Sequence, residues 1–269
     1  MPTINGHVSH WFSELPSPRP ALPGDADADV CIVGAGYTGL WTAYYLAQAD
    51  PSLRITVLEQ RFAGFGASGR NGGWLSGLAP GHRGLLGRQH GRAAVIDWQH
   101  ALDGAVDEVI AVAEREGIDA DIVKGGALDV ARNEPQVQRL RAQVDDDRSW
   151  GDTDSVLLTK DEAAQRVNVD RMLLGAYTPH CARIQPAKLV RGLADTVERR
   201  NSALAESERR YRLLFDSNPL PMYAWDAELT SIVAANEAAQ ERYGYSQVEF
   251  LRLKITDLLD ESELDRFKT

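Results

Sequence analysis

The sequence has little cysteine, no long apolar run and no excess of positive charge. Cysteine occurs twice in 269 residues, at Cys31 and Cys181, which is too few for a disulfide framework and favours a reducing compartment. No stretch approaches the ~18 consecutive apolar residues of a membrane span. The first residues lack the basic and apolar regions of a secretory signal. We therefore expect a cytoplasmic chain with no membrane partner.

The charge balance excludes another class of partner. The chain has 39 acidic residues against 29 Lys and Arg, a net charge of −10, whereas nucleic-acid binding needs a concentrated basic face. We expect no nucleic-acid partner, and no metal site is predicted. Hydrophobic residues at 43% and charged residues at 25% are typical of globular proteins and exclude a disordered or rod-like chain.

The clearest local pattern is a strand, a glycine-rich turn, a helix and a second strand. Asp29–Val33 is a short apolar run that predicts a buried strand, with Cys31 packed inside. Gly34–Gly39 follows, then a helix to Ala49 and a strand at Arg54–Leu58. This order is a βαβ unit.

Further elements are expected along the rest of the chain, although the glycine-dense stretch 64–91 predicts little regular structure. Asn133, Thr159, Asn236 and Ser246 are placed to cap helices. Helices are expected at about 92–115, 133–145, 186–200 and 203–215, and strands or extended segments at 156–158, 175–184, 222–225 and 231–235. The segment 121–131, broken by Gly125 and Gly126, is expected to be a bent strand or a hairpin.

Apolar residues near a 3.5-residue spacing connect the last two long helices: Leu193, Val197, Leu204, Tyr211 and Leu214. That spacing is typical of a coiled-coil-like linker. Two ordinary amphipathic helices explain it equally well.

The glycines of the first turn indicate dinucleotide binding. Gly34 permits the tight turn, Gly36 leaves room for a pyrophosphate, and Gly39 lets helix and strand pack closely. The N-terminus of the following helix presents amide groups and a positive dipole end to the phosphates. Glu59 lies 20 residues beyond Gly39, where a carboxylate can bind ribose hydroxyls. The alternative is a glycine-rich turn that binds nothing.

A second cluster, GASGRNGG, follows Glu59 closely and makes the pattern specific. From Asp29 to about Arg200 the sequence resembles the FAD-dependent glycine/D-amino acid oxidase (DAO) superfamily, in particular the gamma-glutamylputrescine oxidoreductase type. The resemblance rests on the stretches VCIVGAGYTGL, ITVLEQ, GFGASGRNGGWLSG, KGGALDVARN and RIQPAKLVRGLADTVERR. It implies FAD as the cofactor and a Rossmann-like FAD/NAD(P)-binding domain of the α/β class.

The resemblance also implies a role for each residue of the two glycine-rich segments. The pyrophosphate would be lined by Gly34, Gly36, Tyr37, Thr38 and Gly39, and Glu59 would bind the adenosine ribose. The flavin side would be wrapped by Ala67, Ser68, Gly69, Asn71, Gly72 and Gly73, because small residues let backbone pass close to a flat ring. Arg70 would face a phosphate or a substrate carboxylate, or else is a surface cation.

The chemistry implied is oxidation of a C–N bond in a small-molecule amine or amino acid, with hydride transfer to the flavin. The acidic balance of the chain fits a cationic amine loosely. No catalytic base is assigned: His82, His90, His100 and His180 are expected to be surface or structural residues, and Cys181 to be unreactive.

Residues from Glu206 to about Phe267 resemble the first part of a PAS sensor domain. The resemblance rests on SERRYRLLFDSNPLPMYAWD, IVAANEAAQERYGYSQVEFL and ITDLL. It implies a partial α+β module able to sense and to form a homodimer together with the helix before it. The predicted organisation is an extended arm at 1–28, the N-terminal part of the oxidoreductase at 29–200, a linker helix at 201–216 and the partial PAS domain at 217–269.

Three functions remain open. We expect the oxidoreductase domain and the PAS domain both to be truncated and to be joined near Asn201. The junction is natural, engineered or a product of sequence assembly. The first function is an FAD-dependent oxidoreductase. The second is a flavin-binding PAS signalling module without turnover, and the third is a non-functional chimera.

Overall fold

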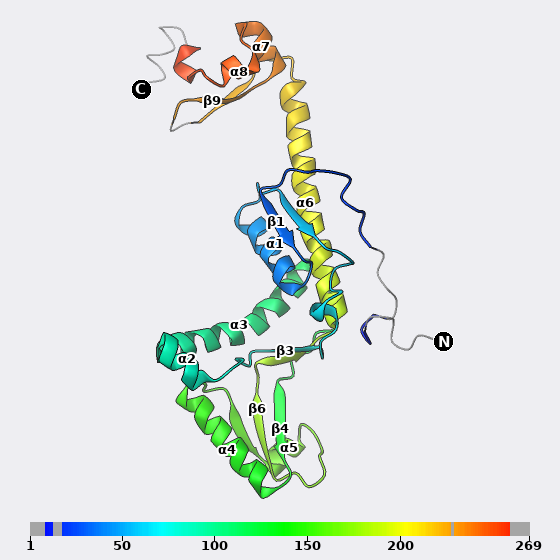
Figure 1. Cartoon of the computed structure of the whole chain (residues 1–269), viewed down its shortest axis with the longest axis vertical. Coiled ribbons are helices and arrows are strands. Elements are labelled where there is room, and N and C mark those ends of the chain that lie inside the picture. The colour runs from blue at the N-terminus through cyan, green and yellow to red at the C-terminus, as the bar shows by residue number, and fades with distance from the viewer. Residues whose placement is uncertain (1–8, 13–17, 227–228, 259–269) are drawn as a thin grey trace, which may run out of the picture. The chain divides into compact units, whose positions relative to one another are not determined.

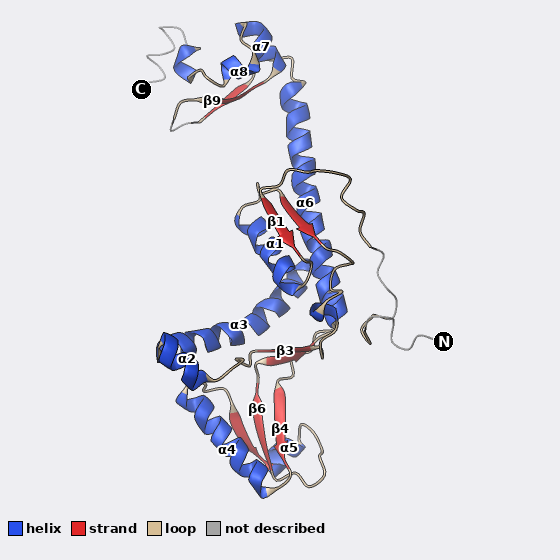
Figure 2. Ribbon diagram, in the orientation of Figure 1, coloured by secondary structure: helices blue, strands red, loops and turns tan. Residues whose placement is uncertain are grey.

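The structure, a computed structural model, describes residues 9–12, 18–226 and 229–258. The chain divides into two compact units, residues 1–198 and 199–269, and each is described by itself. The elements of both are shown in Figures 1 and 2. The strands are β1 (Val30–Val33), β2 (Ile55–Leu58), β3 (Trp74–Ser76), β4 (Ala127–Ala131), β5 (Val156–Thr159), β6 (Leu174–Thr178), β7 (Cys181–Arg183), β8 (Tyr223–Trp225) and β9 (Ile232–Ala235). The helices are α1 (Tyr37–Ala49), α2 (Arg83–His90), α3 (Arg92–Glu116), α4 (Glu134–Ser149), α5 (Lys160–Ala164), α6 (Pro186–Asp216), α7 (Glu237–Tyr243) and α8 (Gln247–Phe250), with short 3₁₀ turns η1 (Ala67–Gly69) and η2 (Ile255–Asp257).

The predicted βαβ unit is confirmed. Strands β1 and β2 pair in parallel, with Val30 opposite Ile55, and α1 connects them. One side of this ribbon packs into a core that α1, α3 and α6 share, with Tyr44, Val112 and Leu193 each fully buried. Burial of such side chains stabilises a domain by roughly 1.5–3 kcal/mol each, so this core holds the start of α1 in place.

The prediction of a fully buried first strand is wrong. Side chains of β1 alternate between partly buried and exposed, Val33 is 85% exposed, and Cys31 is exposed as well. The reason is that the ribbon has two strands and one of its faces is not covered by the described residues. The apolar run therefore predicts the strand correctly but does not predict that both of its faces are buried.

The stretch 64–91 is more regular than predicted, since it contains η1, β3 and α2. Strand β3 pairs antiparallel with β7, and Trp74 lies opposite Arg183. The partner strand comes more than a hundred residues later, so the pairing leaves no local pattern in the sequence. The bent strand expected at 121–131 is interrupted at Gly125 and Gly126 as predicted: Val123 forms an isolated bridge with Arg183, and regular pairing begins at Ala127.

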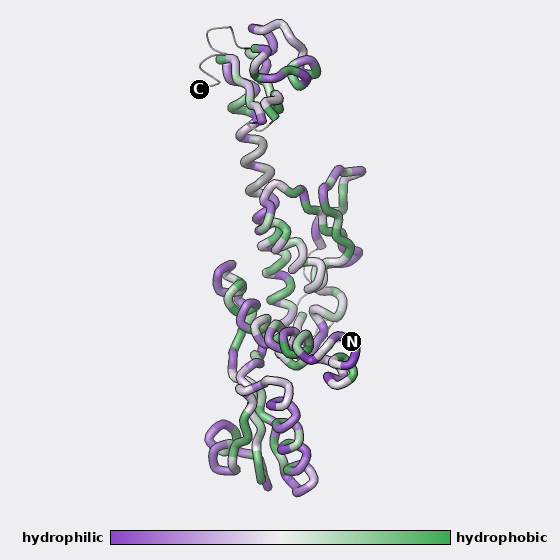
Figure 3. The backbone as a smooth tube through the Cα atoms, turned by 90° about the vertical axis from the view of Figure 1, so that its left-hand side faces the viewer, coloured by the Kyte–Doolittle hydropathy of each residue, from purple (hydrophilic) through white to green (hydrophobic). Residues whose placement is uncertain are grey.

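Unit 1 contains a second sheet with the strand order β4-β6-β5, all antiparallel. Helix α4 packs across all three strands. In Figure 3 the strands contain the hydrophobic stretches and α4 is largely hydrophilic. The predicted N-caps of α4 and α5 are confirmed. Asn133 accepts from the amide of Gln136 at the start of α4, and Thr159 forms a capping box with Glu162 at the start of α5.

Unit 2 contains the β8–β9 ribbon, α7 and α8 around a small core of Ile232, Ala235, Ala239 and Phe250. The expected strands and capped helices are confirmed: Asn236 caps α7, and Ser246 forms a capping box with Glu249. Predicted PAS-like residues beyond 258 lie outside the described residues.

Helix α6 is continuous from Pro186 to Asp216, whereas the sequence predicts two helices. Leu193 and Val197 are buried in the core of unit 1, while Tyr211 and Leu214 are exposed. The apolar stripe therefore does not have one common environment along its length. Across residues 9–12, 18–226 and 229–258, no helix is both long and apolar enough to cross a membrane.

Asn236 is the polar centre of unit 2 and is fully buried. Its Nδ2 donates to the carbonyls of Phe215, Asn218 and Leu220 at 2.9–3.2 Å, and its Oδ1 accepts from the amides of Met222 and Ala239, both at 2.9 Å.

We predict that Asn236→Ala lowers the free energy of unfolding of unit 2 by about 2–4 kcal/mol, because buried backbone groups lose their partners. The control is Asn133→Ala, which removes an exposed N-cap with a single amide partner and costs about 1 kcal/mol. Native-state hydrogen exchange reports each unit separately. Equal losses for the two variants would contradict the prediction.

Candidate functional site

The turn between β1 and α1 has the geometry that a phosphate-binding turn requires. Gly34 has φ of +102°, and its amide donates to the carbonyl of Leu58 at 2.7 Å, which continues the parallel ladder. A Cβ on Gly39 would lie 2.1 Å from the carbonyl oxygen of Gly34. Side chains are therefore excluded where the helix approaches the turn.

The first turn of α1 presents amide groups beside the second glycine-rich segment. The amide of Tyr37 donates to Ser68 Oγ at 2.9 Å, and a Cβ on Gly36 would lie 3.1 Å from the same hydroxyl. Within the described part of the chain, the amides of Thr38 and Gly39 have no acceptor. A helix N-terminus with unpaired amides is a site for an anion.

Glu59 follows β2 directly and lies beside the turn. Its Oε2 accepts from the amide of Ala35 at 2.9 Å, and its Oε1 accepts from the amide of Arg61 at 3.0 Å. The carboxylate is exposed, so its remaining lone pairs can accept from a hydroxyl of a ligand.

The segment 67–73 folds into a tight loop around Asn71. The side chain of Asn71 donates to the carbonyl of Ser68 at 3.0 Å and accepts from the amide of Gly73 at 2.8 Å, and Gly73 has φ of +74°. Gly69 is buried, and a Cβ there would lie 2.3 Å from the carbonyl oxygen of Gly64. The loop conformation thus depends on its glycines and on one amide side chain.

Arg70 and Gly72 lie apart from the glycine turn. The guanidinium of Arg70 is 4.4 Å from the ring centroid of Phe65, and its Nε donates to the carbonyl of the same residue at 2.7 Å. Gly72 is exposed with open space around it, and Ala67 begins the short turn η1. The structure therefore joins Gly34–Gly39, Glu59 and Ser68 directly, and the remaining predicted residues follow along the same loop.

Two contacts of this region have no counterpart in the sequence pattern. Burial raises the pKa of the Tyr37 phenol well above its usual value, and the neutral hydroxyl donates to the carbonyl of Pro186 at 3.0 Å. This bond ties the start of α1 to the start of α6. The second contact comes from the N-terminal segment Ser9–Phe12, which lies against Gly69–Gly73.

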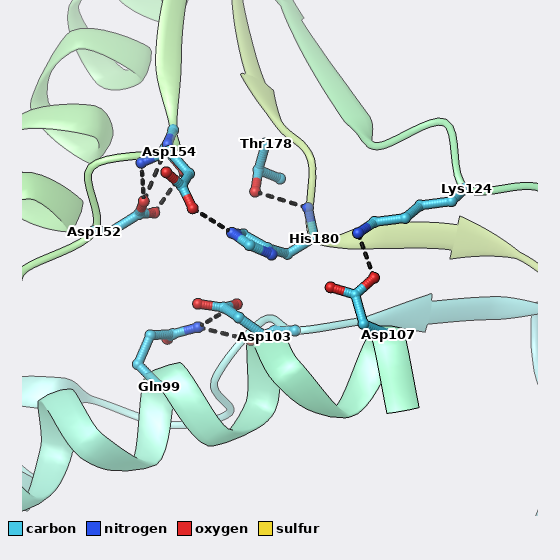
Figure 4. Close-up of polar contacts among 10 residues, drawn as sticks. Gln99, Asp103, Asp107, Lys124, Asp152, Asp154, Thr178 and His180 are labelled. Carbon is cyan, nitrogen blue, oxygen red and sulfur yellow. Dashed lines mark hydrogen bonds and ion pairs between the residues drawn. The ribbon is translucent and has the colours of Figure 1, made fainter. Parts of the chain in front are cut away.

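A second polar cluster surrounds His180 in the turn between β6 and β7 (Figure 4). Its Nε2 lies 2.9 Å from a carboxylate oxygen of Asp154, while its Nδ1 is buried without a partner among the described residues. Burial raises the pKa of the nearby Asp103 carboxyl, and His180 opposes that shift. Burial also acts on Asp152, but hydrogen bonds from Ser155 hold the pKa of Asp152 below its usual value.

Neither cysteine is placed for nucleophilic chemistry at the glycine turn. Burial raises the pKa of the Cys181 thiol, which disfavours the reactive thiolate. Cys31 lies on the exposed face of β1. No group of three or more His, Cys, Asp or Glu side chains suited to a metal ion occurs among the described residues.

We predict that Asp103→Asn stabilises unit 1 at neutral pH. Folding raises the pKa of the Asp103 carboxyl, so the folded state becomes less stable relative to the unfolded state as the pH rises through that pKa. An uncharged amide at this position avoids the loss of stability. The gain should vanish at low pH, where the wild-type carboxyl is protonated. Thermal unfolding across pH tests this against Asp97→Asn, an exposed carboxylate on the same helix that should show no such gain. A lower stability of Asp103→Asn at neutral pH would contradict the prediction.

Comparison with known proteins covers the segment that contains this site. A family model described as FAD dependent oxidoreductase matches residues 29–210, and a model described as PAS domain matches residues 209–269. Gamma-glutamylputrescine oxidoreductase of Escherichia coli K12 is 32% identical over 199 residues, covering 71% of this chain and 45% of the relative. The probable oxidoreductase OrdL of Rhizobium meliloti is 30% identical over 207 residues, covering 72% and 45%.

A solved structure supports the fold. L-amino acid deaminase from Proteus myxofaciens, in complex with anthranilate, superimposes with a TM-score of 0.54 at 17% identity, over 70% of this chain and 39% of that one. The chain spans a little under half the length of the curated relatives it matches. Both predicted resemblances are confirmed, and so is FAD as the cofactor of the family. The chain belongs to the DAO family of FAD-dependent oxidoreductases.

Proposed function

We propose that this chain binds FAD at the first turn of α1 and oxidises the C–N bond of a small amine or amino acid. The observation that carries the proposal is a helix start with unpaired amides at Thr38 and Gly39, approached so closely at Gly36 and Gly39 that side chains are excluded, in a chain of this family. The residues present fit the cofactor. A pyrophosphate needs backbone donors with no side chain in the way, and the turn supplies both.

Most of the predicted residues have a role in this proposal, and Arg70, which lies on the Phe65 ring, has none. The amides of Thr38 and Gly39 would donate to phosphate oxygens, and the dipole of α1 would favour their negative charge. Glu59 would accept from the adenosine ribose. The small residues of the loop 67–73 would let backbone approach the flavin ring, and Asn71 would hold that backbone in shape.

When bound, FAD supplies the two-electron acceptor for a hydride from the carbon bearing the nitrogen, and water then hydrolyses the imine product. The protein's task is to bind and orient the partners. No residue is assigned as the base. The gamma-glutamylputrescine oxidoreductase relative supports a substrate carrying an amine, and the net charge of −10 is compatible with a cationic one.

We predict that the purified chain retains FAD after desalting, with a visible flavin spectrum, and that Gly36→Val weakens FAD binding by more than about tenfold. The added side chain would displace Ser68 Oγ, which lies 3.1 Å from the Cβ position. The matched control is Gly24→Val, at an exposed glycine with open space around it, which should bind FAD as the wild type does.

The same samples separate the competing functions. Anaerobic addition of gamma-glutamylputrescine, putrescine or sarcosine should bleach the flavin if the chain is an oxidoreductase. Flavin that stays bound and oxidised with every substrate would favour the sensor alternative. If the wild type and Gly36→Val both fail to retain FAD, the proposal is wrong.

A second proposal concerns the PAS-like unit: we propose that two copies of this chain associate through the end of α6. Tyr211 and Leu214, three residues apart on one helical face, are 56% and 67% exposed. Apolar side chains at this spacing on an exposed face favour helix pairing, and the PAS match begins at residue 209.

We predict that the full chain elutes as a dimer and that Leu214→Glu makes it a monomer, because a charge would be buried at the helix interface. Light scattering coupled to gel filtration measures the mass. The control is Val248→Glu, an equally exposed apolar residue on α8, which should leave the dimer intact. A monomeric wild type would overturn this second proposal.

A further inference from the structure

The segment Ser9–Phe12 lies against a loop about sixty residues further along the chain. Trp11 Nε1 donates to the carbonyl oxygen of Asn71 at 2.7 Å, and Ser9 Oγ donates to the carbonyl oxygen of Gly69 at 2.8 Å. These two carbonyls belong to the loop whose interior hydrogen bonds are made by the Asn71 side chain. The segment therefore contacts the loop backbone itself and not a neighbouring surface.

The rings of this segment fill the space that the loop glycines leave. Phe12 is 1% exposed and packs edge-on against Phe62, with ring centroids 5.4 Å apart. A Cβ on Gly69 would lie 2.7 Å from the Phe12 ring, and a Cβ on Gly73 would lie 3.2 Å from the Trp11 ring. The glycines at 69 and 73 are thus needed for this packing as well as for the turn.

The other side of the segment is tied to α6. Gln185 Nε2 donates to the carbonyl of Trp11 at 2.9 Å, while Gln185 Oε1 accepts from the amide of Lys188 at 2.8 Å at the start of that helix. Trp11 therefore connects the loop Gly69–Gly73 to the start of α6, where the carbonyl of Pro186 also accepts the hydrogen bond from Tyr37. The family match begins at residue 29, so it assigns these four residues no part in the site.

We propose that Ser9–Phe12 belongs to the flavin site, with Trp11 a positioning residue that holds Gly69–Gly73 in the conformation that receives the cofactor. This inference rests on the proposed FAD binding. A loop rich in glycine loses much conformational entropy when it is ordered, and a segment that orders it beforehand leaves less for the ligand to supply.

The test compares Trp11→Phe with Trp150→Phe in the full chain. Trp11→Phe keeps an aromatic ring but deletes the Nε1 donor, whereas Trp150 is a partly buried indole at the end of α4, away from the loop. We expect hydrogen exchange at the amides of Gly69–Gly73 to be about three- to tenfold faster in Trp11→Phe, as expected for one lost hydrogen bond. Trp150→Phe should match the wild type.

The second readout is the FAD dissociation constant by flavin fluorescence, together with urea unfolding of the apo chain. A positioning role predicts FAD binding about three- to tenfold weaker in Trp11→Phe, with Ser9→Ala changing in the same direction. A merely structural role would lower the urea midpoint and leave the dissociation constant unchanged, which would overturn the proposal. Unchanged exchange at the loop would overturn it as well, whether or not FAD binds. A wild type that retains no FAD would instead reject the proposed function.

Discussion

The amide of Tyr37 donates to the hydroxyl of Ser68, and this hydrogen bond joins the first turn of α1 to the second glycine-rich loop. It can form because Gly36 carries no side chain, since a Cβ there would lie 3.1 Å from the same hydroxyl. Gly39 imposes a similar limit one turn later, where the helix passes the carbonyl of Gly34. The shape of the site depends on these close backbone approaches.

Tertiary contacts then hold the loop from several directions. The start of α6 accepts from the partly buried phenol of Tyr37 and, through Gln185, contacts Trp11. Phe12 closes the space beside Gly69. Because these groups come from three distant parts of the chain, the loop is ordered by the folded unit as a whole. Preorganisation of this kind reduces the entropy that a ligand must otherwise supply.

The glycine turn and the helix caps follow from sequence alone, because their geometry is local. A positive φ at Gly34 and the caps at Asn133, Thr159 and Ser246 each involve residues within a few positions of one another. Such bonds leave a pattern that can be read directly. The pairing of β3 and the contacts of Ser9 and Trp11 join residues sixty or more positions apart, and they leave no such pattern.

Residue types at short fixed spacings are enough to predict the βαβ order, the glycine turn, the acid after β2 and the two family resemblances. The exposed face of β1 and the continuity of α6 through Asn201 are known only from the three-dimensional structure. The packing of Ser9–Phe12 on the loop is known only from it as well. Those outcomes depend on which distant element covers a given surface, and burial of this kind has no signature in neighbouring residues.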